Sequence, residues 1–302
     1  MRIALIINPR AGRNCGLAAA QAAEAVFREA GWEVSRRLTE GPGDAVRLAR
    51  EAAAEGPDAV FACGGDGTLS QALTGLLDTG LPLGIIPAGT GNDFCRALGL
   101  PRDPAQAARL ALTGRPRPID LLEINDGEQW CFNVSGLGFD AAVAERMNRR
   151  RRSTGGLTAY LAAVLHELAH YRPTPVRLTL DGEAWEGRAL LVALANAQGY
   201  GAGMQIAPTA LIDDGYMDVV VVGHLSRASF LWNLPKVFRG THLSLPAVRL
   251  WRCREVTVET PERQPVLVDG DVQAATPLHV RVAPGKARLW VPEGESALFA
   301  EG

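Results

Sequence analysis

Residues 1–125 alternate between short apolar runs and segments whose apolar residues recur with helical spacing. Ile3 to Ile7 is a continuous apolar run, as expected of a strand that is buried on both faces. The alanines and bulky apolar residues of 18–30 then recur every three or four positions, which is typical of an amphipathic helix. Alternation of this kind predicts βαβ units, and therefore a parallel sheet with helices on both faces.

The same stretch contains further elements of both kinds. We expect strands over 32–38, 59–62 and 83–87, and helices over 44–55 and 68–77. Asp44 stands where an N-cap residue is favoured. We therefore place an α/β domain at residues 1–125, and we expect a C-terminal tail at 288–302 to return to it.

The pattern changes near residue 120, where Asp-Gly pairs begin to separate strand-like runs. The pairs are Asp126–Gly127, Asp181–Gly182, Asp214–Gly215 and Asp269–Gly270. Asp-Gly between two strands is a strong hairpin signal. With strands expected over 188–197, 217–223 and 266–268, residues 126–287 should form a mainly antiparallel β domain, interrupted by one helical insertion at 141–171.

Charge and cysteine usage narrow the function classes. The formal net charge is −2, whereas a general nucleic-acid binder should be clearly basic. Five cysteines form no Cys-x-x-Cys pair, which disfavours a disulfide framework or zinc site and fits a reducing cytoplasm. No stretch approaches the roughly 18 apolar residues of a membrane span, so we expect membrane contact to be peripheral.

The lysines are informative because there are so few. Lys236 and Lys286 are the only two, and neither lies in a glycine-rich loop, so the GxxxxGK[ST] phosphate loop is absent. Any nucleotide phosphates must therefore be held by backbone N–H groups, arginine or metal.

Three glycine-rich segments each follow a predicted strand. They are Asn8-Pro9-Arg10-Ala11-Gly12, then Gly64-Gly65-Asp66-Gly67-Thr68, and then Pro87-Ala88-Gly89-Thr90-Gly91-Asn92-Asp93-Phe94. All fall at the carboxyl ends of predicted parallel strands, which is the edge where open α/β sheets bind ligands.

The second segment has the composition of a phosphate site with an added carboxylate. Its glycines allow close backbone approach, and a following helix N-terminus offers free N–H groups to phosphate. Thr68 can cap that helix or donate to a phosphate oxygen. Asp66 would repel phosphate unless a cation or a transferable proton mediates, as in metal-assisted phosphoryl transfer. The alternative is that each segment is simply a glycine-rich turn.

Together the three segments resemble the catalytic domain of the diacylglycerol kinase and sphingosine kinase superfamily, and the soluble bacterial lipid kinases in particular. The Gly-Gly-Asp-Gly-Thr box alone is shared with NAD kinases. The resemblance continues through 119–121, 132–140, 208–218 and 268–271, and so covers nearly the whole chain. It implies a three-layer nucleotide-binding α/β domain followed by a C-terminal, mainly antiparallel β-sandwich.

The resemblance also implies a nucleotide site. Its residues would be Asn8, Pro9, Arg10, Ala11, Gly12, Thr39, Gly64, Gly65, Asp66, Gly67, Thr68, Leu69, Ser70, Thr90, Asn92 and Asp93. Two alternatives stay open: Thr39 is also compatible with an ordinary loop threonine, and Asn92 with Asp93 could be a helix N-cap pair.

A structural Mg²⁺ site is implied in the segment 211–218. By resemblance, the Asp214 carboxylate and the Leu211 and Tyr216 carbonyls would be ligands, and Asp120 would organise metal and water. Hard oxygen ligands around a tight turn suit Mg²⁺. The alternatives are an acidic turn for the segment and a salt bridge for Asp120.

Asp271 falls where the family usually has Glu, as the base that takes the proton of the lipid hydroxyl. A general base must come within hydrogen-bond reach, and Asp is one methylene shorter than Glu. Asp66 is the alternative base or metal ligand, and a plain hairpin turn is the alternative for Asp269 to Asp271.

The resemblance thus predicts an ATP- and Mg²⁺-dependent kinase acting on a diacylglycerol-like lipid at a membrane surface. An NAD kinase-like enzyme and a non-catalytic nucleotide- or lipid-binding regulator are the alternatives. Four arginines at 149–152 could hold anionic head groups at about 1 kcal/mol each, or form a solvated loop. The oligomeric state stays open, with a homodimer as one alternative.

Overall fold

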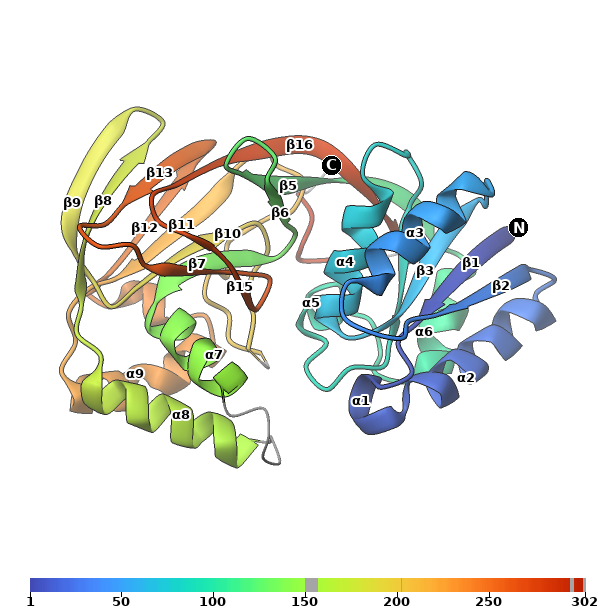
Figure 1. The fold of residues 1–302 in the computed structure, drawn as a ribbon, viewed down its shortest axis with the longest axis horizontal. Helices are drawn as coiled ribbons and strands as arrows, with labels where there is room; N and C mark the ends of the chain where they lie inside the picture. The colour runs from blue at the N-terminus through green and yellow to red at the C-terminus, as the bar shows by residue number, and fades with distance from the viewer. Residues whose placement is uncertain (150–156, 202, 294–295, 301–302) are drawn as a thin grey trace.

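The computed structural model describes residues 1–149, 157–201, 203–293 and 296–300, and shows two domains side by side (Figure 1). The α/β domain lies on the right of the view and the β-rich domain on the left. Residues 150–152 of the arginine run lie outside the described residues, so its predicted role is not examined by the structure.

The N-terminal domain is built on a parallel sheet with strand order β2-β1-β3-β4. Its strands are β1 (Arg2–Ile7), β2 (Glu33–Leu38), β3 (Ala59–Gly64) and β4 (Leu83–Pro87). Its helices are α1 (Ala11–Asn14), α2 (Gly16–Glu29), α3 (Asp44–Ala54), α4 (Asp66–Leu76), α5 (Asp93–Ala97) and α6 (Pro104–Ala111).

Helices cover both faces of this sheet, which explains the continuous apolar run of β1. Ile3, Leu5 and Ile7 pack against the buried face of α2 and α6. Ala4 and Ile6 point the other way, into the core formed with α3, α4 and α5. Because successive strand residues alternate between faces, a strand between two helical layers must be apolar throughout. The predicted three-layer architecture is confirmed.

Two long strands run between the domains, β5 (Arg115–Ile124) and β16 (Leu278–Val291). They pair antiparallel to each other over most of their length, with an irregularity between Ala283 and Ala287. Near its end β16 lies beside β4 through the pair Leu289 and Leu83, and near its start it pairs with β13. One large sheet therefore passes from the α/β domain into the β domain.

The C-terminal domain packs two sheets face to face. Its other strands are β6 (Gln129–Cys131), β7 (Val134–Gly138), β8 (Thr174–Leu180), β9 (Glu183–Ala189), β10 (Leu191–Ala195), β11 (Met217–Val222), β12 (Val248–Cys253), β13 (Glu255–Glu259), β14 (Pro265–Val268) and β15 (Asp271–Ala275). The second sheet has the order β12-β11-β10-β7-β14-β15 and is antiparallel. Apolar residues of both sheets share one core, so the predicted antiparallel sandwich is confirmed.

The helical insertion contains two helices, α7 (Phe139–Arg149) and α8 (Leu157–His170). A further helix, α9 (Arg227–Phe238), was not predicted. Proline at position 235 lies inside α9, and none of its residues is buried, so the sequence lacks the apolar periodicity that marks a core helix. Figure 1 shows α8 and α9 along the lower edge of the β domain.

Three of the four Asp-Gly pairs form hairpin turns. In these three, Asp126, Asp181 and Asp269 have positive φ, as the tight hairpin turn requires. The prediction for Asp214–Gly215 was wrong, because this pair lies in the long connection that precedes β11. There the Asp214 carboxylate accepts the Tyr216 N–H at 2.9 Å, a local turn that joins no pair of strands.

The predicted single strand over 188–197 was also wrong in one respect: it is divided between β9 and β10, with a break at Leu190. The helices of the described segments all fall short of the length and apolar character that crossing a bilayer demands.

Candidate active site

Close backbone contacts bring the three glycine-rich segments together at the carboxyl edge of the parallel sheet. A Cβ on Gly12 would lie 2.2 Å from the Ala88 carbonyl oxygen, and Gly12 also has a φ of +56°. A Cβ on Gly89 would lie 2.5 Å from the Cα of Gly65. Larger side chains at these positions would push the three turns apart, so the glycines are required by packing.

Asn8 and Thr68 connect the first two segments. The Asn8 side-chain amide donates to the Thr68 hydroxyl at 3.1 Å, and the Asn8 backbone N–H donates to the Cys63 carbonyl at 2.9 Å. Because Thr68 accepts this bond, its own proton remains available to donate. The helix α4 has Gly65 as its N-cap, with no side-chain cap bond. Its first N–H groups therefore remain suited to a phosphate.

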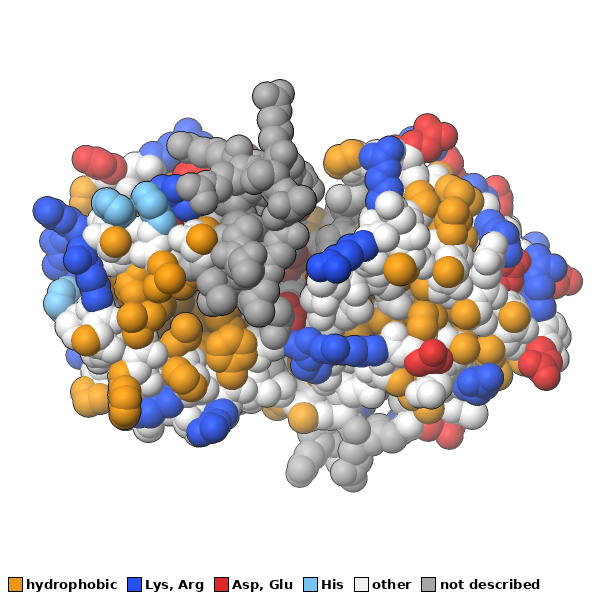
Figure 2. Space-filling view, turned by 90° about the horizontal axis from the view of Figure 1, so that it is seen from below, with side chains coloured by type: hydrophobic (Ala, Val, Ile, Leu, Met, Phe, Trp, Pro, Cys, Tyr) orange, Lys and Arg blue, Asp and Glu red, His pale blue; other side chains and the backbone are white. Residues whose placement is uncertain are grey.

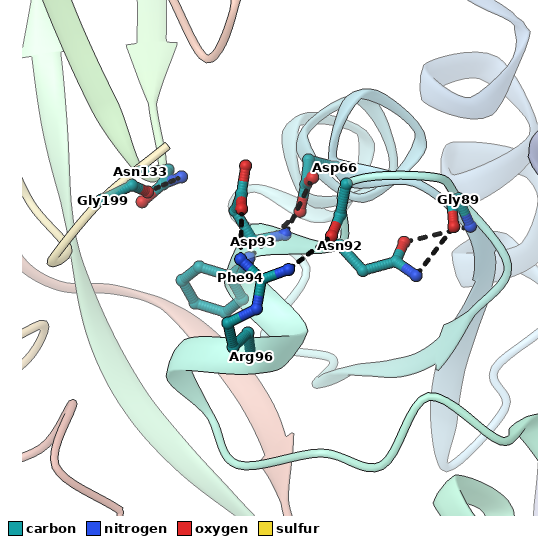
Figure 3. A network of polar contacts seen from close by, with 9 residues as sticks. Asp66, Gly89, Asn92, Asp93, Phe94, Arg96, Asn133 and Gly199 are labelled. Atoms are coloured by element: carbon teal, nitrogen blue, oxygen red, sulfur yellow. Dashed lines mark hydrogen bonds and ion pairs between the residues drawn. The ribbon is translucent and has the colours of Figure 1, made fainter. Parts of the chain in front are cut away.

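Asp66 occupies the first turn of α4, because α4 begins two residues earlier than predicted. Its carboxylate accepts the backbone N–H groups of Asp93 and Phe94, both at 3.1 Å, and so caps α5 from another element (Figure 3). Burial raises the pKa of Asp66, although the two N–H bonds oppose that shift. The half-buried carboxylate still has lone pairs for a cation, since each ionised carboxylate offers about four acceptor sites.

Asn92, which directly precedes α5, locks the third segment rather than capping that helix. It has left-handed backbone (φ 50°) and forms no cap bond. Its side-chain oxygen accepts the Gly89 N–H at 3.0 Å, and its amide donates to the Gly89 carbonyl at 2.9 Å. The capping alternative was therefore wrong for Asn92, because the Asp66 carboxylate accepts the first N–H groups of α5 instead.

Arg96 is a site residue that the sequence reasoning missed. Its guanidinium pairs with Asp93 at 2.9 Å and donates to the Gly91 carbonyl at 3.3 Å (Figure 3). The signal was present, since residues three apart on a helix are neighbours and Asp93 precedes Arg96 by three.

Asp269 holds the β14–β15 turn of the C-terminal domain against the N-terminal domain. It accepts from the Ser70 hydroxyl of α4 at 2.7 Å and from the backbone N–H groups of Phe132 at 3.0 Å and Asn133 at 2.8 Å. Burial raises the pKa of Asp269. Ser70 lies one helical turn after Asp66, so this hydrogen bond brings the Asp269 turn beside the glycine turn of α4.

A second contact across the junction is aromatic. The rings of Phe94 and Phe132 lie 3.9 Å apart between centroids. Phe94 is the residue whose N–H Asp66 accepts, and Phe132 is one whose N–H Asp269 accepts. Each aspartate therefore fixes one partner of the ring pair. Figure 3 shows Asn133 and Gly199 of the C-terminal domain across from Asp93.

Asp271 differs from both of these aspartates. It begins β15, is exposed, and its carboxylate has no hydrogen-bond or ion-pair partner among the described residues. It lies two residues after Asp269, which places it close to the junction without burying it. Its carboxylate is therefore free to contact a substrate.

Asp120 lies beside the segment that was predicted to bind Mg²⁺. Its two carboxylate oxygens accept the N–H groups of Gly215 at 2.7 Å and Gly285 at 2.8 Å, and its own N–H donates to the Ile212 carbonyl. The salt-bridge alternative for Asp120 was wrong, because both partners are backbone groups. Burial raises the pKa of Asp120.

Asp214 shares that segment and forms an ion pair with Arg252. Burial raises the pKa of Asp214, and the charge of Asp120 adds to that shift. The segment thus holds two mutually repelling carboxylates and, by chain position, the Leu211 and Tyr216 carbonyls, and oxygen donors of these kinds are what Mg²⁺ prefers. No group of three or more acidic, His or Cys side chains occurs in the described part of the chain, so carbonyls and water would have to complete the coordination. The metal ligands stay a prediction.

The other predicted nucleotide residues lie along the same edge. The Thr39 N–H donates to the Ile7 carbonyl at 2.9 Å, which places Thr39 at the carboxyl end of β1. Arg10 and Thr90 are exposed, and Ala11 is buried. Pro9, Gly67, Leu69 and Ser70 belong to the turns and the first two turns of α4 described above. Their contact with nucleotide stays a prediction.

Comparisons with known proteins cover nearly the whole chain. Residues 2–124 match the diacylglycerol kinase catalytic domain, and residues 133–291 match the YegS C-terminal NAD kinase beta sandwich-like domain.

Similar full-length proteins are known from several bacteria. A diacylglycerol kinase of Mycobacterium tuberculosis is 37% identical over 96% of this chain and 95% of its own length. A diacylglycerol kinase of Bacillus subtilis is 31% identical over 91% of each protein. A probable lipid kinase YegS-like of Xanthomonas euvesicatoria is 34% identical over 98% of this chain and 97% of its own. The solved structure of a putative diacylglycerol kinase from Bacillus anthracis superposes with a TM-score of 0.79 at 26% identity, covering 97% of this chain and 99% of the other.

Proposed function

Because this chain belongs to the diacylglycerol kinase catalytic-domain family, we propose that it transfers the γ-phosphoryl group of ATP to the hydroxyl group of a lipid. A diacylglycerol-like lipid is the substrate we expect, since relatives over nearly the full length carry that name.

The observation that carries this proposal is the hydrogen bond between Ser70 and Asp269, 2.7 Å long. It joins the phosphate-type turn of one domain to the aspartate turn of the other. Asp66 lies one helical turn from Ser70, and Asp271 lies two residues from Asp269. A phosphate donor on one domain and a hydroxyl acceptor on the other would therefore meet at this junction.

The nucleotide belongs on the N-terminal side. The uncapped start of α4 and the Thr68 hydroxyl can donate to phosphate oxygens. Exposed Arg10, on the turn after β1, and exposed Arg13, in α1, add positive charge to the segment that follows β1. These features hold phosphate without the lysine of a GxxxxGK[ST] loop.

The acceptor belongs beside Asp271. Its carboxylate takes the proton of the lipid hydroxyl as the lipid oxygen forms a bond to the γ-phosphorus. The bond from that phosphorus to the bridging oxygen breaks, and ADP leaves with the electron pair. Little covalent chemistry falls to the protein in phosphoryl transfer, so positioning accounts for most of the rate.

Mg²⁺ fits two places by the chemistry of the donors. Asp66 retains acceptor capacity at the phosphate edge, and Asp120 with Asp214 offers hard oxygen at the segment before β11. When bound near the phosphates, such an ion would neutralise charge that develops during transfer.

The test is to incubate the purified chain with γ-labelled ATP and a mixed lipid extract, and to identify the labelled product by mass. NAD in place of lipid serves as the parallel acceptor. A phosphorylated lipid, absent when Asp271→Asn replaces the wild type, supports the proposal. Label in NAD would make the chain NAD kinase-like, and no labelled product in either reaction would favour a binding regulator.

A further inference from the structure

We propose that the exposed face of α8 and α9 is a docking surface for an anionic lipid bilayer. This inference rests on the proposed lipid kinase function and names the surface that would bring the junction to its substrate.

The helix α9 is unusual for the exposure of its side chains. None of its residues is buried, whereas Trp232 is 83% exposed, Phe238 47% and Leu231 45%. Trp232, Leu165 of α8 and Phe238 are the three most exposed large hydrophobic side chains of the described residues. Concentrated exposure of this kind marks an interaction site rather than ordinary surface.

Helical spacing arranges these side chains in two adjacent rows. Leu231, Pro235 and Phe238 follow one another at four and three residues and form an apolar row. Trp232, Lys236 and Arg239 have the same spacing and form a second row, in which two cations follow the indole. Apolar and basic side chains side by side are typical of helices that lie in a membrane interface.

The charge of the surrounding segment favours an anionic partner. Residues 223–247 contain no Asp or Glu, and they contain Arg227, Lys236 and Arg239. On α8, the acidic Glu167 is paired with Arg146. A surface with cations and without acidic groups on its own segment complements anionic head groups, each cation contributing roughly 1 kcal/mol near such a surface.

The helices α8 and α9 form one surface. The Arg227 guanidinium donates to the carbonyl of Ala169 near the end of α8, and Phe230 packs with Val164 in a shared apolar cluster. Leu165 follows Val164 and points outward, at 54% exposed. Leu165 thus extends the apolar surface of α9 onto α8.

The surface lies on the face where the two domains part. Figure 2 shows that face, with hydrophobic side chains gathered over the β domain and basic ones at their margins. In Figure 1 the same face is the lower edge, which carries α8 and α9. A bilayer seated there would lie at the mouth of the junction that holds Asp66 and Asp271.

The test measures binding of the full chain to vesicles without ATP. Vesicles of phosphatidylcholine with phosphatidylglycerol are compared with phosphatidylcholine alone by co-flotation. Trp232→Asp and Phe238→Asp should each weaken binding at least about tenfold, because each removes one apolar side chain that would be buried in the bilayer. Lys236→Gln should weaken it roughly fivefold, and only on the anionic vesicles. Leu110→Asp on α6 is the matched control, since Leu110 is 40% exposed on a helix of the other domain and should leave binding unchanged.

Brominated lipids give a second readout, because they quench only tryptophans that enter the bilayer. Wild type should be quenched, and Trp232→Phe should bind nearly as well but lose that quenching. Equal vesicle binding by wild type and Trp232→Asp would overturn the proposal. So would a sedimenting dimer that Trp232→Asp dissociates while vesicles stay unbound, since the face would then belong to a second copy of the chain.

Kinase activity on diacylglycerol in detergent micelles separates this inference from the proposed function. Micelle activity without vesicle binding would overturn the docking surface alone. Vesicle binding that depends on Trp232, without phosphorylation of any lipid, would support the docking surface and overturn the kinase.

Discussion

Two aspartate-bearing glycine turns meet at the domain junction, one at the start of α4 and one between β14 and β15. In the first, Asp66 accepts two backbone N–H groups of α5. In the second, Asp269 accepts two backbone N–H groups and the hydroxyl of Ser70, while Asp271 stays exposed and its carboxylate has no polar partner among the described residues. Each turn thus has one carboxylate that is fixed by backbone N–H donors. Only the C-terminal turn also carries a carboxylate without such donors, that of Asp271.

The difference separates two kinds of work. A carboxylate that accepts backbone N–H groups sets the shape of the site, and its pKa reflects burial against those bonds. An exposed carboxylate can approach a substrate and take its proton. Asp66 combines the two because it fixes α5 and keeps lone pairs toward the junction. Asp269 only shapes the site, and Asp271 only approaches the substrate.

The largest effect should come from Asp66→Asn. The amide leaves one N–H of α5 facing an amide donor and removes the negative charge at the phosphate edge. We expect the rate of lipid phosphorylation to fall about a thousandfold. The free energy of unfolding should fall by only about 1 to 2 kcal/mol. Asp58→Asn is the matched control, since Asp58 also accepts a backbone N–H, from Arg2, at the start of β1. Near-full activity of Asp66→Asn would show that the Asp66 carboxylate takes no part in phosphoryl transfer.

Asp269→Ala should lower the free energy of unfolding by about 3 kcal/mol, because it leaves buried donors of Phe132, Asn133 and Ser70 without an acceptor. The measurement is the urea midpoint. Asp126→Ala is the control, because Asp126 has the same left-handed backbone, with φ 55° against 50°, at an exposed hairpin turn. Equal losses in both variants would mean that only backbone strain was measured.

The C-terminal domain holds another fixed carboxylate, Asp140, which accepts the Tyr200 hydroxyl at 2.9 Å and the Ala141 N–H at 2.8 Å. Burial raises the pKa of Asp140 from 3.8 to about 6. Ionising this buried carboxylate therefore lowers the free energy of unfolding. The loss is absent well below pH 3.8, grows between pH 3.8 and pH 6, and is complete above pH 6.

Asp140→Asn removes that cost and keeps both hydrogen bonds, since the Tyr200 hydroxyl can turn to accept. Relative to wild type, we expect a gain in unfolding free energy of about 0.5 kcal/mol at pH 4 and of about 3 kcal/mol at pH 8. Urea unfolding at both values measures it. A gain that does not depend on pH would contradict the raised pKa.

Ser70→Ala should have the smallest effect, a loss of about 1 kcal/mol, because Asp269 keeps its backbone donors. The loss should disappear when Ser70→Ala is combined with Asp269→Ala, as expected for partners in one bond. Ser35→Ala, which loses a bond to the Ile3 carbonyl within one domain, is the control and should remain additive with Asp269→Ala. If the effects of Ser70→Ala and Asp269→Ala were additive, the hydrogen bond between the two turns would contribute nothing to stability.

Sequence patterns predicted what depends on neighbours along the chain. The apolar run of β1, the helices between strands and the glycine turns at strand ends are all local signals, and the structure has them. The helix α9 was not predicted because none of its residues is fully buried and Pro235 lies inside it, so its sequence lacks the broad apolar face of a core helix.

The site was predicted less completely, because its key contacts join distant residues. Ser70 and Asp269 are 199 positions apart, and nothing near Asp269 in sequence shows that its oxygens meet α4. Asp214–Gly215 carries a hairpin signal, yet Asp120, 95 positions away, holds the Gly215 N–H. Tertiary partners decide such turns, and local propensity does not reveal them.

The division between fixed and reactive carboxylates is tested most directly at Asp271. The measurement is kcat for diacylglycerol phosphorylation together with the Kd of ATP, for Asp271→Asn and Asp271→Glu. We predict that Asp271→Asn lowers kcat by about a thousandfold with ATP affinity unchanged, and that Asp271→Glu remains active. Wild-type kcat in Asp271→Asn would contradict the assignment of Asp271 as the base.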